Sequence, residues 1–405
     1  MPKTDPKKIE HLLTRNVEQV VDKQHLAAAL KSNKKLRVKL GIDPTGEKMH
    51  IGRAVVLWKL REFQDLGHKI VLIIGDFTAQ IGDPSDKLSK RPMLSREQVE
   101  KNMRDYLSQI GKILDLRKTE TCYNSKWLDK LNFRETAELA ESFSVQQMLH
   151  RRNFQERWKE GQDISLREFL YPIIQGYDSV AIKADVELGG TDQLFNLMAG
   201  REVQKHYGQK PQDIMTVGML SGTDGRKMST SWGNVINIAD PADEQFGKVM
   251  AMRDEMIPEY FRACTCLSEK EIAAQEKELK RGANPRDVKM ILAKEIVALY
   301  HGRAAADKAA EKWVKVFSKK DVSGADIPEL RLSAKGGSAS GGKKLTAVDL
   351  VLKSGVAKSK SEAWRLVAQG GLKVGEETMQ NPKKELNLRA GTVIRVGKKR
   401  FFFVV

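Results

Sequence analysis

The stretch that most constrains the fold is residues 41–53, which read Gly-Ile-Asp-Pro-Thr-Gly-Glu-Lys-Met-His-Ile-Gly-Arg. An apolar run at residues 36–42 predicts a buried strand before it, and residues 54–66 carry apolar side chains at helical spacing after it. A strand, a tight turn and a helix N-terminus form a local anion site, because free backbone N–H groups and the helix dipole point at one place. Taken alone, the stretch is most simply interpreted as an ordinary strand–turn–helix connection.

A second stretch, residues 225–231, reads Gly-Arg-Lys-Met-Ser-Thr-Ser and lies on a glycine-flanked loop. It offers cations and hydroxyls, the groups that stabilise a polyphosphate as it leaves. Together the two stretches resemble the paired HIGH and KMSKS motifs of class I aminoacyl-tRNA synthetases. Residues 50–52 match HIGH except for its last letter, where Arg53 stands, and residues 227–231 depart from KMSKS only at Thr230. The pair in this order is a strong signal, whereas each motif alone is weak.

The order of the expected elements indicates an α/β fold. Strands are expected at residues 36–42, 70–75, 180–188 and 214–220, and helices at 54–66, 165–179 and 194–207. Such alternation predicts a Rossmann-like, doubly wound parallel sheet. Loops rich in glycine and aspartate follow two of the strands, at residues 75–85 and 189–193. Open sheets of this kind bind their ligands at such strand ends.

The pattern divides the chain into four parts. We expect a catalytic domain at residues 1–237 with a helical insertion at about 97–164, an α-helical domain at 238–330, a flexible linker at 331–344 and a small α+β domain at 345–405. Within the insertion, the apolar residues Phe143, Val145, Met148 and Leu149 suit either core packing or a subunit contact.

The composition indicates what kind of partner the chain binds and in which cellular compartment it works. The formal net charge of +17 suggests a polyanionic partner. The three cysteines form neither an even disulfide framework nor a metal set, which favours a reducing cytoplasm and predicts no protein metal site. Residues 1–10 are charged and the longest apolar runs are short, so we expect no export signal and no membrane segment.

The last part of the chain is strongly basic. Residues 343–405 hold 14 Lys and Arg against 5 Asp and Glu, a net charge of +9. Residues 355–363 and 370–374 resemble the small RNA-binding module first seen in a ribosomal protein, with helices expected at 347–355 and 359–370 and strands at 373–374, 393–396 and 401–405. The charge indicates RNA binding, and the simpler alternative is a basic, solvated domain without a partner.

The resemblance implies adenylate formation, in which a carboxylate attacks the α-phosphorus of ATP and pyrophosphate leaves. It implies that the leaving phosphates and the nucleotide are held by two sets of residues. The first would act on the phosphates: Thr45, His50, Lys87, Arg91, Lys227 and Thr230. The second would bind ATP: Gly41, Asp43, His50, Gly52, Arg53, Gly190, Asp192, Lys227, Met228 and Ser229. A threonine at 230 weakens the clamp by one charge, and Arg53 could bind oxygen or stack in place of the usual histidine.

The amino acid pocket resembles that of the tyrosyl-tRNA synthetases. The resemblance implies that the amino acid is bound by Lys39, Asp83, Tyr171, Gln175, Asp178 and Gln193. Asp83, Tyr171 and Gln175 would hold the ammonium, Asp178 would accept from the phenol hydroxyl, and Gln193 would place the carboxylate. Tyr171, Gln175 and Asp178 share one face of a helix, so one ligand could meet all three. Many relatives carry a tyrosine where this chain has Lys39. Lys39 either pairs with Asp178 or, the reading we favour here, faces away into solvent.

The family resemblance extends over the whole chain and matches the bacterial tyrosyl group. It implies L-tyrosine, ATP with Mg²⁺ bound through the nucleotide, and tRNA(Tyr) as ligands, no inserted editing domain, a homodimer and a cytoplasmic location. One alternative is the same chemistry on tryptophan, against which Asp178 and the basic C-terminal module argue. Another is a noncatalytic RNA-binding protein, left open by Arg53 and Thr230 but opposed by the many charged site residues that remain.

Overall fold

The chain forms two compact units in a computed structural model, residues 1–310 and 311–405, and each is described by itself. The structure describes residues 5–32, 34–85, 93–315, 329–330, 345–357, 359–375, 377–386, 388, 392–397 and 400–404. Within these residues, no helix is long and apolar enough to cross a membrane.

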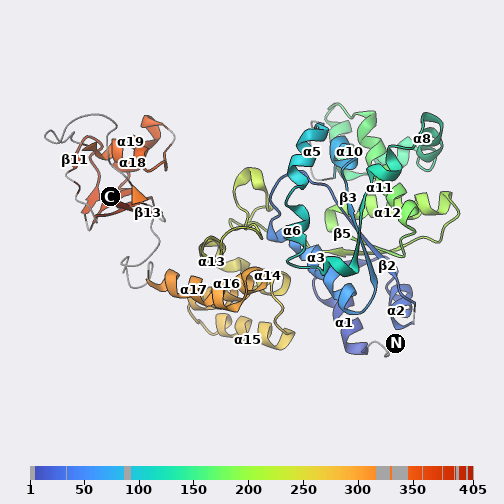
Figure 1. Cartoon of the computed structure of the whole chain (residues 1–405), viewed down its shortest axis with the longest axis horizontal. Coiled ribbons are helices and arrows are strands. Elements are labelled where there is room, and N and C mark those ends of the chain that lie inside the picture. The colour runs from blue at the N-terminus through green and yellow to red at the C-terminus, as the bar shows by residue number, and fades with distance from the viewer. Residues whose placement is uncertain are drawn as a thin grey trace. The chain divides into compact units, whose positions relative to one another are not determined.

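A six-stranded sheet in the order β1-β6-β5-β2-β3-β4 forms the centre of the first unit, counted over the described residues (Figure 1). Its strands are β1 (Val17–Val20), β2 (Arg37–Ile42), β3 (Lys69–Ile74), β4 (Thr119–Tyr123), β5 (Val186–Gly190) and β6 (Asp213–Val217). All neighbours are parallel except β1, which pairs antiparallel with β6. The strand order reverses between β2 and β5, and this arrangement confirms the predicted doubly wound α/β fold.

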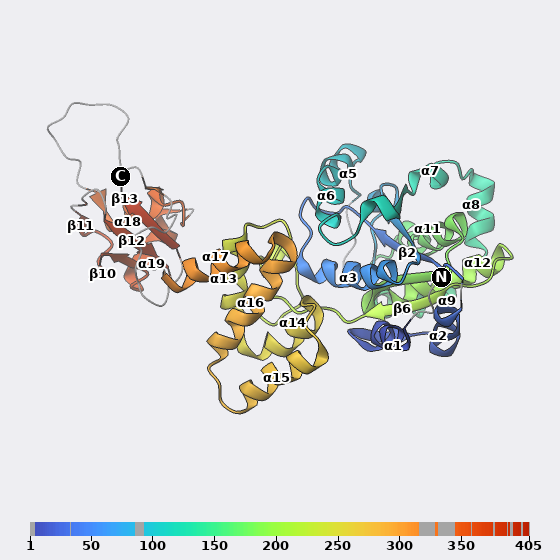
Figure 2. The same ribbon diagram turned by 60° about the horizontal axis from the view of Figure 1, so that its bottom comes forward.

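Helices cover both faces of this sheet (Figures 1 and 2). They are α1 (Pro6–Thr14), α2 (Lys23–Lys31), α3 (Ile51–Asp65), α4 (Thr78–Ile81), α11 (Leu166–Ile182) and α12 (Leu194–His206). Strand β3 is apolar on both faces because helices pack on each; its residues Ile70, Val71 and Leu72 are fully buried.

The region expected to be a helical insertion is mostly helical but also supplies an edge strand. Its helices are α5 (Arg96–Met103), α6 (Tyr106–Ile110), α7 (Ser125–Leu128), α8 (Phe133–Ala140), α9 (Val145–Leu149) and α10 (Arg152–Lys159). Strand β4 lies between α6 and α7 and pairs with β3. Sequence reasoning missed it because its residues are all only half-buried, as suits a sheet edge.

One expected strand is wrong in its position. Residues 180–188 alternate in hydrophobicity, but α11 runs on to Ile182, and β5 begins only at Val186. Val180 and Ile182 are buried on the helix, and Lys183 ends it in the left-handed conformation with φ of 52°. Pro172 lies inside α11 without ending it. Strand β1 was also not anticipated, because its segment follows the helical pattern of residues 5–32.

The rest of the first unit is helical, as the pattern after residue 238 predicts. It contains α13 (Ala242–Ala251), α14 (Ile257–Cys264), α15 (Glu269–Lys280), α16 (Pro285–His301) and α17 (Arg303–Trp313), which ends just beyond the unit boundary. Asn284 caps α16 by accepting from the backbone N–H of Arg286, and Pro285 occupies the first helical position.

The second unit is a small α+β domain. Its helices are α18 (Ala347–Lys353) and α19 (Lys360–Ala368), and its strands are β7 (Glu329–Leu330), β8 (Leu345–Thr346), β9 (Leu372–Val374), β10 (Glu377–Met379), β11 (Glu385–Leu386), β12 (Val393–Val396) and β13 (Arg400–Val404). Strand β7 pairs with β13, so the sheet of this unit begins before the expected linker. The linker itself, 331–344, lies outside the described residues.

Candidate active site

A cavity of about 290 Å³ opens at the carboxyl ends of β2 and β5, where the strand order reverses. This is where the doubly wound fold is expected to bind its ligand. The cavity brings together residues from both motifs and from the expected amino acid pocket. Of the predicted site residues it is lined by Gly41, Asp43, Thr45, His50, Gly52, Arg53, Asp83, Tyr171, Gln175, Asp178, Gly190, Asp192, Gln193, Lys227 and Met228.

Among the described residues of the predicted set, Ser229, Thr230 and Lys39 do not line this cavity. Ser229 and Thr230 lie just beyond it, with Thr230 exposed at the start of a short 3₁₀ helix, Thr230–Trp232. Lys87 and Arg91 fall in residues 86–92, outside the described part of the chain. Lys39 contacts two residues that line the cavity, Gln175 and Glu187, as described below.

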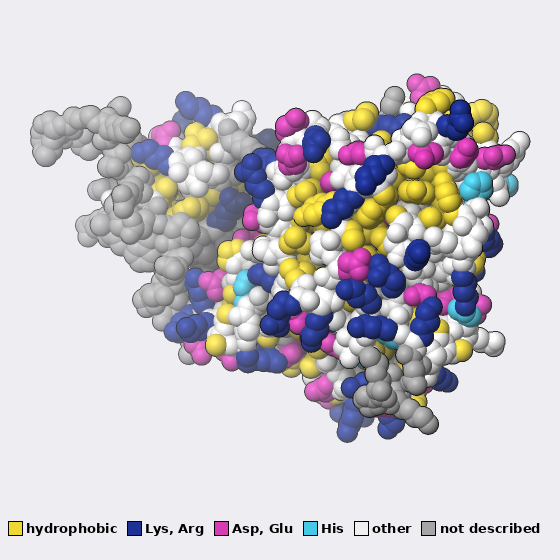
Figure 3. All heavy atoms as spheres, turned by 45° about the vertical axis from the view of Figure 1, so that its right-hand side comes forward, with side chains coloured by type: hydrophobic (Ala, Val, Ile, Leu, Met, Phe, Trp, Pro, Cys, Tyr) yellow, Lys and Arg dark blue, Asp and Glu magenta, His cyan; other side chains and the backbone are white. Residues whose placement is uncertain are grey.

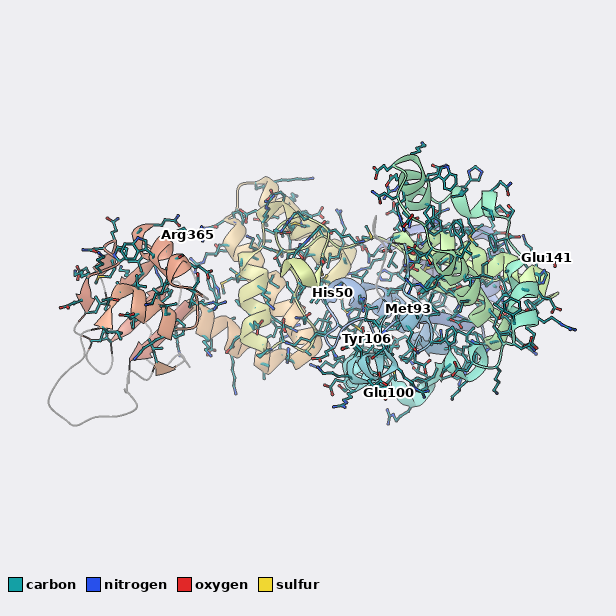
Figure 4. The ribbon with its side chains drawn as sticks, turned by 90° about the horizontal axis from the view of Figure 1, so that it is seen from above. His50, Met93, Glu100, Tyr106, Glu141 and Arg365 are labelled. Atoms are coloured by element: carbon teal, nitrogen blue, oxygen red, sulfur yellow. The ribbon has the colours of Figure 1, made fainter. Side chains whose placement is uncertain are left out.

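His50 stands at the start of α3, labelled in Figure 4. Burial, and then the charge of Arg53, lower its pKa to about 4, so the imidazole is neutral at pH 7. Its Nδ1 is buried and has no hydrogen-bond partner among the described residues. A Cβ added at Gly52 would lie 3.0 Å from that nitrogen and 3.1 Å from Sδ of Met228. Glycine at 52 therefore lets the two motifs pack against each other.

The two motifs are also joined through the backbone. The N–H of Ile51 donates to the carbonyl of Ile236 at 2.8 Å, and that of Ile238 donates to Met49 at 2.9 Å. Residues 236–238, which follow the second motif, therefore run beside the start of α3, and Asn237 forms an isolated antiparallel bridge with His50. These bonds fix the distance between the helix N-terminus and the Lys227 loop.

Arg53 does not point away from the site. Its Nη2 donates to Oγ1 of Thr45 at 2.9 Å and its Nη1 donates to the hydroxyl of Tyr106 at 2.7 Å. Figure 4 labels Tyr106, which lies on α6. The guanidinium thus orients the Thr45 hydroxyl at the cavity wall. A lysine could not make both bonds from one planar fork.

The Lys227 loop is held by a buried asparagine that sequence reasoning did not single out. Asn234 is 4% exposed, and its Nδ2 donates to Oδ1 of Asp224 at 2.8 Å and to the carbonyl of Lys227 at 3.0 Å. Its Oδ1 accepts from the backbone N–H of Ser229 at 2.8 Å. Across the cavity, Nζ of Lys227 lies 3.9 Å from Oδ2 of Asp192.

A hydrogen-bonded group surrounds Asp43 at the end of β2. Its carboxylate accepts from Thr78 and from the hydroxyl of Tyr171, each at 2.7 Å. Burial raises the pKa of Asp43 to about 6, opposed by these two bonds. A Cβ at Gly75 would come within 2.0 Å of Oδ1 of Asp43, so only glycine fits there.

Asp178 lies at the buried end of the cavity, 3% exposed. It accepts from Nε1 of Trp127 at 2.8 Å and from Nδ2 of Asn124 at 3.3 Å. Burial raises its pKa to about 7, while the charge of Lys39 and the bond from Trp127 act in the opposite direction. Sequence reasoning found Asp178 but missed Asn124 and Trp127, which follow the unanticipated strand β4.

Asp83 joins a second polar group at the cavity wall. Its carboxylate accepts from Nε2 of Gln193 at 2.7 Å, from Nδ2 of Asn196 at 3.3 Å and from the hydroxyl of Ser85 at 2.5 Å. Nη2 of Arg151, a nearly buried side chain, lies 3.7 Å from it. Asp83 and Gln193 were both predicted from the sequence, and the structure brings them into direct contact.

The preferred expectation for Lys39 is wrong. The side chain is fully buried, not solvated, and its Nζ lies 2.8 Å from Oε1 of Glu187 on the neighbouring strand. Its partner is Glu187 rather than Asp178. Val38 and Leu40 are also buried, because β2 is covered on both faces, so alternation could not tell which face Lys39 takes.

Among the described residues, no cluster of three or more His, Cys, Asp or Glu side chains could hold a metal ion.

The family model for class I tRNA synthetases (W and Y) matches residues 30–318. The fold, the two motifs and the cavity thus define a class I tRNA synthetase. The tyrosine–tRNA ligase of Thermotoga maritima is 47% identical over 98% of this chain and 97% of its own length. That of Carboxydothermus hydrogenoformans is 44% identical over 100% and 99%. The chain belongs to the tyrosine–tRNA ligase family.

Solved structures share the fold at low sequence identity. The tyrosyl-tRNA synthetase of Archaeoglobus fulgidus, in complex with L-tyrosine, gives a TM-score of 0.60 at 21% identity over 76% of this chain and 100% of its own. The tryptophanyl-tRNA synthetase of Plasmodium falciparum gives 0.58 at 13% identity over 75% and 88%. Backbone similarity alone does not distinguish tyrosyl-tRNA from tryptophanyl-tRNA synthetases, because both give similar TM-scores. The relatives that match over the full length are tyrosine–tRNA ligases.

Proposed function

We propose that this chain activates L-tyrosine with ATP to tyrosyl-adenylate and transfers the tyrosyl group to tRNA(Tyr). The observation that carries the assignment is that Asp178 and both motif residues, His50 and Lys227, line one cavity. In the first step a tyrosine carboxylate oxygen bonds to the α-phosphorus and the bond to pyrophosphate breaks. In the second, a ribose hydroxyl of the tRNA end attacks the tyrosyl carbonyl and AMP leaves.

Asp178 is the proposed recognition group for the phenol. An ionised carboxylate accepts from the hydroxyl of tyrosine, whereas phenylalanine would leave it buried without that bond. A site built to hydrogen-bond a substrate hydroxyl strongly rejects the analogue that lacks it, because the buried polar group of the site is then left unpaired. Asp83, Tyr171 and Gln175 would hold the ammonium and Gln193 the carboxylate.

ATP is proposed to bind along the opposite wall. Gly41, Gly52 and Gly190 leave room for the nucleotide, and Asp43 and Asp192 supply acceptors for its hydroxyls. The neutral imidazole of His50, with its free buried Nδ1, suits a hydrogen bond to phosphate without adding charge. Met228 and Ser229 belong to the loop expected to close over the nucleotide.

Positioning and charge stabilisation are proposed to carry the chemistry, since none of these residues is a nucleophile. Thr45, held by Arg53, and Lys227 would stabilise the departing pyrophosphate, joined by Thr230, Lys87 and Arg91. Mg²⁺ is proposed to enter bound to the ATP phosphates, the way this ion is usually held.

The proposed domain roles are a catalytic domain at 1–237, an anticodon-binding domain at 238–330, a linker at 331–344 and an RNA-binding domain at 345–405. The net charge of +9 in residues 343–405 supports the last of these. The enzyme is proposed to be cytoplasmic, in keeping with its three free cysteines.

A homodimer is proposed through an apolar face of the first unit. Figure 3 shows hydrophobic side chains gathered on the side of α8, α11 and α12. Phe133 is 91% exposed, Leu166 78%, Trp158 68% and Val145 58%. Of the patch expected from the sequence, Val145 is exposed, whereas Met148 is buried in a core cluster. Exposed apolar side chains in such number indicate a partner surface.

The test is charging of tRNA(Tyr) with labelled tyrosine by the full chain and by a chain ending at Lys315. The shorter chain lacks β7 and all of the second unit after Lys315. We expect adenylate formation to persist, and tRNA affinity and its salt dependence to fall. Failure of the full chain to charge tRNA(Tyr) would contradict the function. Equal tRNA affinity in both chains would contradict the role of the second unit.

A further inference from the structure

Lys39 and Glu187 form a buried ion pair at the proposed amino acid end of the cavity, where Glu187 lines the wall and Lys39 lies behind it. Lys39 lies on β2 and is 0% exposed; Glu187 lies on β5 and is 1% exposed. Besides Glu187, Nζ of Lys39 donates to Oγ of Ser179 at 2.8 Å and to the carbonyl of Gln175 at 3.0 Å. These three acceptors use all three donors of the ammonium.

The carboxylate of Glu187 is also fully used, because each of its two oxygens faces two donors. Its Oε1 faces Nζ of Lys39 at 2.8 Å and accepts from Nε2 of Gln175 at 3.3 Å. Its Oε2 accepts from Oγ of Ser179 at 3.2 Å and from Nε2 of Gln212. An ionised carboxylate accepts and never donates, so whatever faces it must present an N–H or O–H.

This requirement determines the orientation of Gln175. A glutamine amide can be turned either way, with its NH₂ or its oxygen toward a given neighbour. Glu187 admits only the NH₂ group. Gln175 lines the cavity, and with its NH₂ group bonded to Glu187 its amide oxygen is left as the acceptor available to a ligand. An ammonium group needs that kind of partner.

The pair also connects the three elements that meet at this end of the cavity. Lys39 comes from β2, Glu187 from β5, and Gln175 with Ser179 from α11. Gln175 is thus bonded at both its backbone carbonyl and its side chain, by opposite members of one pair. Its side chain has little freedom to swing away or to turn over.

We propose that Lys39 and Glu187 are positioning residues for substrate recognition, which hold the amide oxygen of Gln175 toward the α-ammonium of the bound amino acid. The inference rests on the proposed function, in which Gln175 contacts the ammonium. Lys39 itself touches no ligand in this account, which replaces its predicted role as a tyrosine-binding residue. A purely structural pair would tie the strands to the helix without affecting which ligand groups are preferred.

The test compares two ligands that differ only in the ammonium. L-Tyrosine and 3-(4-hydroxyphenyl)propanoate share the phenol and the carboxylate, so the ratio of their dissociation constants isolates the ammonium contact. The variant is K39M/E187L in the full chain, because apolar replacement of both members leaves no unpaired buried charge. Titration calorimetry measures both ligands, and thermal unfolding checks the fold.

We expect the preference for tyrosine over the propanoate to fall roughly tenfold in the variant, because the ligand ammonium would lose its hydrogen bond to the amide oxygen of Gln175. The propanoate affinity should change little. The matched control is K205M/E202L, which removes an exposed pair on α12 whose members lie 2.8 Å apart. It should leave the preference unchanged. If K39M/E187L does not fold, K39M/E187Q keeps the volume of Glu187 and permits the same comparison.

An unchanged preference, or an equal loss for both ligands, would overturn the positioning role and leave the pair as a structural tie. Absence of any preference for tyrosine in the wild-type chain would instead overturn the proposed function, and with it this inference. As a final check, Q175A should lower the preference by itself. Adding K39M/E187L to Q175A should then lower it no further, because the pair acts through Gln175.

Discussion

Nε1 of Trp127 donates to Oδ1 of Asp178 across 2.8 Å, linking the edge of the sheet to α11 at the buried end of the cavity. The bond stabilises the ionised carboxylate, and with Lys39 it opposes the burial that raises the pKa of Asp178 to about 7. The carboxyl group therefore changes charge near neutral pH.

Tyrosine binding should follow this titration. The phenol donates to the ionised form, so affinity should fall by up to about tenfold per pH unit below 7 and level off above it. In Trp127→Phe the lost bond raises the pKa further, which should move the midpoint to higher pH. Titration calorimetry from pH 5 to 9 measures the dissociation constant of tyrosine at each pH, with Trp364→Phe in the second unit as the control variant. A flat profile, or a midpoint that moves down, would refute the role of Asp178.

Ionisation of the buried Asp178 carboxyl group should also lower the stability of the fold. Its folded pKa of about 7 lies above the ordinary 3.8, so the folded state binds the proton more tightly. Stability should therefore fall as pH rises from about 4 to 7, and the penalty should be complete above 7. The Asp178→Asn side chain carries no charge at either pH. The melting temperature of the variant minus that of the wild type should therefore be larger at pH 8 than at pH 5. An equal difference at both pH values would argue against a buried, ionising Asp178.

Lys227→Ala should slow adenylate formation far more than it weakens tyrosine binding. The ammonium is expected to act on departing pyrophosphate, a charge that develops only in the reaction, and loss of such a group slows a reaction by roughly 10²–10³-fold. Single-turnover rates and tyrosine dissociation constants separate the two effects. Equal losses in both would contradict the role.

Gly52→Ala should weaken ATP binding, because its Cβ would lie 3.0 Å from Nδ1 of His50 and 3.1 Å from Sδ of Met228. The tight contact should shift the two motif residues apart. Gly46→Ala is a matched control on the same turn, since nothing described lies within 4 Å of a Cβ there. Similar KM values for ATP in both variants would show that close packing at Gly52 does not matter.

Much of the fold could be predicted because it depends on local patterns. The strand–turn–helix at residues 36–66 and the Lys227 loop carry their own turn and cap residues, and the structure brings them together at one cavity. The expected strand at 180–188 failed because Val180 and Ile182 fit a buried helix face as well as an alternating strand. Over so short a stretch, the helical period and the two-residue period of a strand cannot be told apart.

The supporting residues could not be predicted, because each acts across the fold. Asn124 and Trp127 reach Asp178 only through the position of β4 at the sheet edge, and Glu187 reaches Lys39 only through the pairing of β2 with β5. Asn234 lies close to the Lys227 loop in sequence. Its bonds to Asp224 and Ser229 nevertheless depend on the loop folding back over it.

The most direct test of the central claim is ATP–pyrophosphate exchange by the wild-type chain with tyrosine, phenylalanine and tryptophan in turn. The account predicts exchange with tyrosine alone, and in Asp178→Asn a reduced gap between tyrosine and phenylalanine. Exchange with tryptophan would show that the pocket has been misassigned. Absence of exchange with all three would contradict the proposed activation chemistry itself.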